Sequence, residues 1–123
     1  MADPRTEGLD VLKQMLPGLI PEDATTMRDG GIADELGDLG LEHVFGALWN
    51  RPGLDRRSRS LVTLGALIAL RATGELKSHF PIALRNGLSI EEIEEVIYHM
   101  TAYAGYPAAV NARSVAREVL AGS

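Results

Sequence analysis

Apolar side chains recur every three or four residues along most of this chain, which is the spacing of one face of an α-helix. The pattern predicts a short helix over Thr6–Leu16, ended by Pro17 and Gly18, and a second apolar helical face that begins at Leu41 and runs to Trp49. No segment alternates apolar and polar residues with the period of two that is typical of a half-buried strand. The sequence therefore predicts an all-α fold.

The segment from Leu61 to Leu70 is apolar on every side rather than on one face. It is too short to span a bilayer, and its Ala and Leu content favours a helix over a buried strand. Asp55 is well placed to cap the start of this helix. Because a helix that is apolar all round is normally buried, we expect other elements to enclose it on most sides.

Three further helices are expected in the second half of the chain. One covers Glu75–Asn86 and ends at Gly87, which tolerates the left-handed conformation of a helix stop. The Ser89–Glu92 segment is a capping box that begins a helix ending at Gly105, and a last helix covers Pro107–Leu120. A chain of 123 residues is long enough for one core, so residues 1–123 are expected to form a single domain.

Composition limits the classes of function. The formal net charge is -5 with acids and bases interspersed, so we expect no nucleic-acid partner. Without an apolar N-terminal core or a long apolar run, we expect a cytoplasmic protein with no membrane partner. There is no cysteine, which excludes disulfides and thiol-based redox chemistry, and the three histidines have no metal-ligand spacing, so no metal site is expected.

Glu75 and His79 are four residues apart, so both side chains lie on the same face of the predicted helix. A carboxylate orients an imidazole and raises its basicity, and partial burial makes the ring a tunable acid or base. The same spacing also fits a buried histidine that is merely satisfied by a backbone carbonyl. The pattern leaves both readings open.

Glu95, His99 and Tyr103 form a second ladder with the same spacing along the edge of an apolar stripe. A row of acid, imidazole and phenol can relay a proton or bind a carboxylate. The alternative is that these three residues form a row of polar contacts at a subunit interface.

Four arginines cluster around one turn and the start of the helix after it: Arg51, Arg56, Arg57 and Arg59. Guanidinium groups bind carboxylates bidentately, and a helix N-terminus adds positive potential. Surface ion pairs with the many glutamates are the alternative. Trp49, just before the turn, is expected to have a structural role in packing, but a tryptophan there can also line a binding pocket.

Five ordered segments together resemble the carboxymuconolactone decarboxylase family: Trp49–Leu70, Glu75–His79, Ala83–Gly87, Glu91–Val96 and His99–Pro107. The resemblance places the family core at residues 45–120 and leaves residues 1–40 as a less characteristic N-terminal helical segment. It implies an alkylhydroperoxidase D/carboxymuconolactone decarboxylase-like bundle of about six or seven helices. It also implies a homo-trimer or homo-hexamer with the active site near subunit contacts.

The family has a peroxide-reducing branch and a decarboxylase branch. The alkylhydroperoxidase D-like branch uses a Cys-x-x-Cys-x-x-x-His motif whose histidine matches His79, but its cysteine positions fall on Ala72 and Glu75 here. Peroxidase activity by that route is excluded. The other branch is similar at Arg51–Arg57, at Glu75–His79 and in the segment that starts at His99.

The decarboxylase resemblance implies cofactor-free loss of CO2 from 4-carboxymuconolactone, giving an enol-lactone in the β-ketoadipate pathway of aromatic-acid catabolism. Electrons left by CO2 would spread into a dienolate that must be reprotonated. The alternatives are a family paralogue with a different small-molecule lyase or isomerase activity, and a non-catalytic oligomeric binding protein.

The same resemblance, together with side-chain chemistry, suggests a role for each candidate residue. Arg51 and Arg56 would bind the carboxylates of the substrate, with Trp49 beside them. His79, oriented by Glu75, would deliver the proton. The lactone oxygen would be stabilised by His99 or Tyr103.

Overall fold

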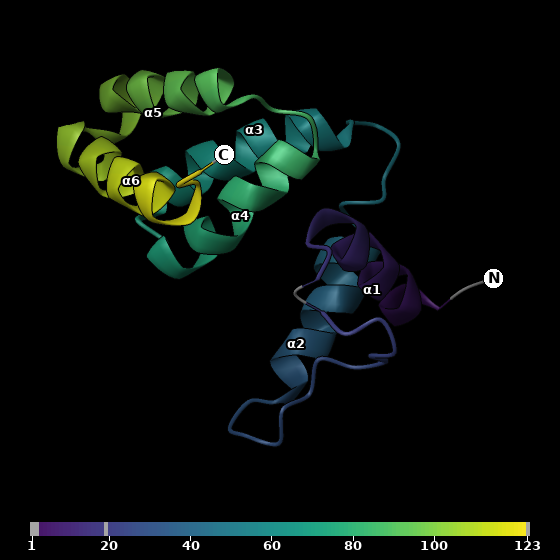
Figure 1. Ribbon diagram of the computed structural model, residues 1–123. Coiled ribbons are helices and arrows are strands. Elements are labelled where there is room, and N and C mark those ends of the chain that lie inside the picture. Colours follow the sequence, from purple (N-terminus) through teal and green to yellow (C-terminus); the bar gives the residue numbers. More distant parts are fainter. Residues whose placement is uncertain (1–2, 19, 123) are drawn as a thin grey trace. The chain divides into compact units, whose positions relative to one another are not determined.

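The computed structural model describes residues 3–18 and 20–122 (Figure 1). These residues contain six α-helices, one π-helix and no strand, which confirms the predicted all-α class. The elements are α1 (Pro4–Met15), α2 (Glu35–Gly40), η1 (Leu41–Gly46), α3 (Arg56–Leu70), α4 (Thr73–Arg85), α5 (Ile90–Ala104) and α6 (Tyr106–Val119). They fall into two compact units, Met1–Asp55 and Arg56–Ser123. The single-domain organisation stays a prediction.

In the first unit, α1 packs closely against the π-helix η1. The side chain of Asp3 caps α1 by accepting hydrogen bonds from the amides of Arg5 and Thr6, so the helix begins two residues before the predicted Thr6. A Cβ atom added to Gly8 would overlap the carbonyl oxygen of Leu41. Glycine therefore allows the two helices to approach each other.

The apolar face predicted from Leu41 onward is shifted by the π-helix. A π-helix has more residues per turn than an α-helix, and the amide of Trp49 bonds to the carbonyl of Val44, five residues back, at 2.9 Å. As a result Leu41 and Trp49 are buried, whereas Val44 and Leu48 are exposed. The α-helical spacing predicted the wrong members of the buried face at these two positions.

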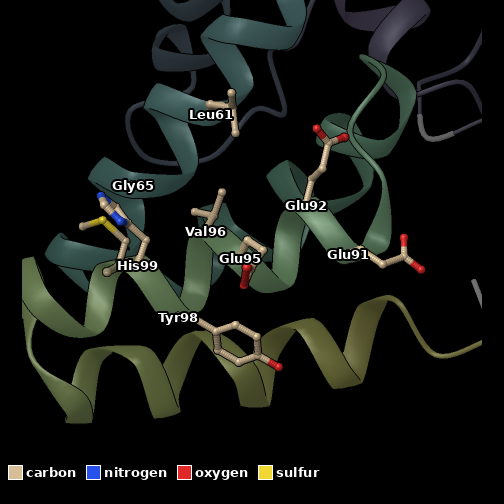
Figure 2. A pocket seen from close by; sticks show the side chains of 9 residues that line it. Leu61, Gly65, Glu91, Glu92, Glu95, Val96, Tyr98 and His99 are labelled. Carbon is tan, nitrogen blue, oxygen red and sulfur yellow. The ribbon is translucent and has the colours of Figure 1, made fainter.

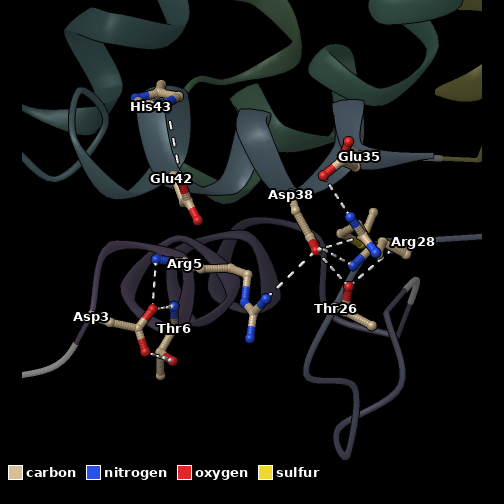
Figure 3. A network of polar contacts seen from close by, with 10 residues as sticks. Asp3, Arg5, Thr6, Thr26, Arg28, Glu35, Asp38, Glu42 and His43 are labelled. Carbon is tan, nitrogen blue, oxygen red and sulfur yellow. Dashed lines mark hydrogen bonds and ion pairs between the residues drawn. The ribbon is translucent and has the colours of Figure 1, made fainter. Parts of the chain in front are cut away.

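Asp38 is a buried carboxylate that ties an irregular segment of the first unit to its helices (Figure 3). It accepts hydrogen bonds from the Thr26 hydroxyl at 2.7 Å and from the Met27 amide at 2.8 Å. Guanidinium atoms of Arg5 and Arg28 lie 3.7 and 3.9 Å from it. The hydrogen bonds from Met27 and Thr26 lower the pKa of Asp38, because they stabilise the ionised carboxylate.

The second unit consists of α3 to α6 around a core that includes Leu64, Ile68, Leu76, Phe80 and Ala112. Helices α3 and α4 run antiparallel, since only Arg71 and Ala72 connect them and the Asn86 side chain bonds the Ser60 hydroxyl at the opposite end.

The predicted helix stop at Gly87, the capping box and the helix end at Gly105 are confirmed, whereas α4 begins at Thr73, two residues before the predicted Glu75. Gly87 adopts a φ of 106°, and the amide of Leu88 bonds the carbonyl of Ala83 as the chain leaves α4. The Ser89–Glu92 capping box is present at the start of α5. Gly105, also in the left-handed region, separates α5 from α6.

Helix α3 is less enclosed than its composition predicts. Leu64 and Ile68 are fully buried, but Val62 is 66% exposed and Leu70 is 75% exposed. Ala66 lies on the same exposed side, because residues four apart share a helix face. Within the second unit α4, α5 and α6 cover only one side of α3, so the expectation of a helix covered on most sides is wrong for this unit. No helix within the described ranges is long and apolar enough to cross a membrane.

Candidate active site

The pair predicted on α4 is brought together. The Nε2 atom of His79 lies 4.0 Å from Oε2 of Glu75, one helical turn away. His79 is only 8% exposed, while the side chain of Glu75 is largely in solvent. The apolar residues around the ring position, Leu76, Phe80 and Ala83, are fully buried and belong to the core of the second unit.

Burial sets the proton affinity of His79. Removing the ring from water lowers its pKa, because the charged imidazolium loses hydration, and the nearby carboxylate of Glu75 opposes that effect. The free protein therefore holds the imidazole mostly neutral at pH 7. A negatively charged ligand beside the ring would favour the protonated form, so the pair can take up a proton on binding and release it to a ligand.

The α5 ladder forms only in part. The rings of His99 and Tyr103 lie 5.0 Å apart, and both side chains are exposed. Between Glu95 and His99, which lie on the described part of α5, no hydrogen bond or ion pair forms. Glu95, His99 and Tyr103 therefore lie in a row on the surface of α5, but they do not form a continuous path for proton transfer.

His99 lines an open groove of about 820 Å³ between α3 and α5 (Figure 2). Its apolar lining comprises Leu61, Gly65, Val96 and Met100, and its polar side also carries Glu91, Glu92 and Glu95. Neither His79 nor Glu75 is among the described residues that line it. The sequence predicted Glu92 only as part of the capping box and did not mark Glu91 or Glu92 as groove residues, although both lie within about one turn of Glu95 on the same helix.

The carboxylates make this groove unfavourable for an anionic ligand. Glu92 forms an ion pair with Arg57 and accepts a hydrogen bond from the amide of Ser89. That amide contact first, and Arg57 next, lower the pKa of Glu92, so it stays ionised. Glu91 and Glu95 add further negative charge to the groove, so an anionic ligand would be repelled there.

The arginines do not converge on one point within the second unit. Arg57 pairs with Glu92, as the surface-ion-pair reading predicts. The contact between Ser60 and Asn86 marks one level along the antiparallel pair of helices. Arg56, half-buried at the start of α3, precedes Ser60 by four residues and so lies about 6 Å from this level toward one end of the pair. His79 precedes Asn86 by seven residues and so lies about 10 Å from this level toward the other end. Arg56 and His79 of one copy are therefore separated by about 16 Å along the helix axes.

Arg51 and Trp49 belong to the first unit. Arg51 is exposed, and Trp49 is buried with its ring stacked on Phe45 at a centroid distance of 6.4 Å. This packing gives Trp49 an architectural role, while its predicted contact with substrate stays a prediction. No group of three or more His, Asp or Glu side chains among the described residues could hold a metal ion.

Comparison with known proteins identifies related sequences. Residues 34–118 match the model of the carboxymuconolactone decarboxylase family. A 4-carboxymuconolactone decarboxylase from Acinetobacter baylyi is 44% identical over 75 residues, which cover 61% of this chain and 56% of that protein. A nitrosuccinic acid decarboxylase from Metarhizium robertsii is 36% identical over 115 residues, covering 93% of this chain and 79% of that protein.

An uncharacterised 15.0 kDa protein from Paracoccus denitrificans is 37% identical over 83 residues, 66% of this chain and 62% of that protein. The chain thus spans a little over half the length of the Acinetobacter relative it matches. Since the family model covers more than half of the chain, and the Metarhizium match extends over nearly all of it, the chain belongs to the carboxymuconolactone decarboxylase family.

Proposed function

We propose that this protein decarboxylates a small carboxylic acid without a cofactor, and that the acid carries an electron-accepting group conjugated with the bond that breaks. The observation that carries the proposal is the buried His79 with Glu75 4.0 Å away. The names of two relatives, a 4-carboxymuconolactone decarboxylase and a nitrosuccinic acid decarboxylase, support the reaction type.

The two named substrates share one chemical requirement. When CO2 leaves 4-carboxymuconolactone, the electron pair of the broken C–C bond moves through the C=C bond into the lactone carbonyl and forms a dienolate. In nitrosuccinic acid a nitro group can accept the pair. Both anions need one proton on carbon to complete the reaction, and no electron is gained from or lost to another molecule. A protein therefore assists by placing the acid and supplying that proton.

His79 is suited to supply the proton. An anionic substrate over the ring favours the imidazolium, since the opposite charge offsets the cost of burial. Glu75, on the same helix, stabilises the same charged form. Once CO2 has left, the imidazolium transfers its proton to carbon and returns to the neutral form that the buried site favours.

The cations that hold the substrate carboxylates are proposed to come from a second copy of the chain. Arg56 lies too far along the helix axes from His79 of its own copy for direct contact. The exposed apolar side of α3, with Val62 and Leu70, is a surface that self-association would cover. In this proposal a homo-trimer or homo-hexamer brings Arg56 of one copy to His79 of another, and Arg51 and Trp49 also bind the substrate. His99 or Tyr103 would stabilise the lactone oxygen, and Tyr103 suits an anionic substrate better because His99 lines the acidic groove.

The test is to incubate purified protein with 4-carboxymuconolactone and, separately, with nitrosuccinic acid, following loss of the first by ultraviolet absorbance and release of CO2 from both. Turnover of at least one acid above the buffer rate is expected. His43→Ala is the matched control, because that ring is exposed in the first unit and should leave the rate unchanged. No turnover of either acid would remove the proposal and favour a non-catalytic binding protein or a paralogue with another substrate.

A further inference from the structure

A second groove, between α5 and α6, lies away from the α4 pair. Its volume is about 330 Å³, within the lower range of sites that hold small ligands. Its apolar lining includes Ile90, Ile93, Ile97, Ala116 and Leu120. A smaller hollow of about 110 Å³ also includes Ile97 and shares Tyr98 and Arg113 with this groove, so these residues stand where the two meet.

The charge of this groove differs from that of the chain as a whole. The chain carries a formal net charge of -5, yet Arg113 and Arg117 line the groove against a single carboxylate, Glu94. The two arginines are four residues apart, so they share one face of α6. Within the described ranges neither forms a hydrogen bond or an ion pair, whereas Arg28 and Arg57 both pair with glutamates.

We propose that the α5–α6 groove binds a small amphipathic carboxylate. Its aromatic or branched aliphatic body would lie against Ile90, Ile93 and Leu120, where burial of apolar surface is favourable. Its carboxylate would accept paired hydrogen bonds from the guanidinium of Arg113, with Arg117 adding attraction. Tyr98, whose ring points from α5 toward α6 in Figure 2, offers a phenol at the same end.

Size and charge favour this occupant over others. Inorganic phosphate would meet the arginines but would leave the apolar floor uncovered. A helix of a second copy is about 10 Å across, so a groove with a volume of about 330 Å³ is too small to hold it. The site is independent of the proposed decarboxylation, since it uses α5 and α6 rather than Glu75 and His79.

The test uses the full chain labelled with ¹⁵N and titrated with benzoate, and with benzamide as the uncharged analogue of the same shape. We expect saturable shifts at amides of α5 and α6, including Tyr98 and Arg113, and at least tenfold weaker binding of benzamide. Arg113→Gln should weaken benzoate binding at least tenfold, and Arg113→Lys should weaken it less. His79→Gln should leave these shifts unchanged, which separates this site from the catalytic one.

Arg71→Gln is the matched control, since Arg71 is an exposed arginine in the turn between α3 and α4. Circular dichroism melting curves establish that each variant is folded. Equal binding of benzamide and benzoate, an unchanged affinity in Arg113→Gln, or shifts confined to α4 would overturn the proposal. So would groove resonances that respond to protein concentration and not to benzoate, because a second copy would then occupy the groove.

Discussion

The imidazole of His79 and the carboxylate of Glu75 lie 4.0 Å apart on one face of α4, with the ring buried and the carboxylate largely in solvent. This arrangement lets two opposing effects act on one proton. Burial disfavours the imidazolium, and Glu75 favours it.

Replacing Glu75 by Gln should lower the pKa of His79 further. The pKa already lies below the usual 6.5 because of burial, and Glu75 is the group that raises it. An NMR titration of the His79 ring protons measures the pKa directly in both proteins. Glu95→Gln on α5 is the control and should not move it. A His79 pKa that rises in Glu75→Gln would contradict the geometry.

Acidification should destabilise the fold through His79. Between its folded pKa and 6.5 the unfolded chain binds more protons at this residue than the folded chain does, so the free energy of unfolding falls as the pH is lowered through that window. Urea unfolding at pH 7.5 and 5.5 measures the change. His79→Gln should show a smaller fall over the same interval, and an equal fall in both proteins would assign the effect to other groups.

Ser89→Ala should destabilise the protein by about 1 kcal/mol, as is usual when a helix loses its N-terminal cap. The Ser89 side chain accepts a hydrogen bond from the amide of Glu92, which Ala cannot replace. Urea unfolding of both proteins at pH 7.5 provides the measurement. Ser114→Ala, at an exposed position of α6, is the control and should be close to neutral.

Mixing two inactive variants should restore activity if the site is shared between copies. Arg56→Ala lacks the proposed cation and His79→Ala lacks the proposed proton donor, so each alone should be strongly impaired. Unfolding and refolding them together allows mixed oligomers, in which some sites contain both intact residues. Mixtures that stay as inactive as the separate variants, while light scattering shows oligomers, would rule out the shared site and leave the decarboxylation proposal standing.

Local features of the fold could be predicted from sequence, because they depend on residues close together in the chain. The Ser89–Glu92 capping box and the Gly87 helix stop need only a few neighbouring residues and a glycine with a positive φ. The π-helix could not be predicted, since its close contact with α1 is made across the first unit. The Asp38 network joins segments ten or more residues apart, and no spacing in the sequence marks it.

The candidate site, too, could be predicted only in the features that depend on residues close together in the sequence. Four-residue spacing placed Glu75 and His79 on one face, but only the packed structure gives the burial of the ring and the sign of its pKa shift. Proximity in sequence suggested that the arginines act together, whereas Arg57 pairs with Glu92 and Arg56 starts α3 far from His79. Both relationships depend on how α3 packs against α4 and α5.

In the proposed reaction His79 delivers the proton to the carbon skeleton after CO2 leaves. The most direct test of this step is decarboxylation of 4-carboxymuconolactone in D2O by the wild-type protein and by His79→Gln, with the enol-lactone analysed by NMR at early times. We expect one deuterium on a single face of the carbon next to the lactone carbonyl, and a rate lower by a factor of about 100 or more in His79→Gln. A variant that keeps both the wild-type rate and the single-face labelling would contradict this role of His79.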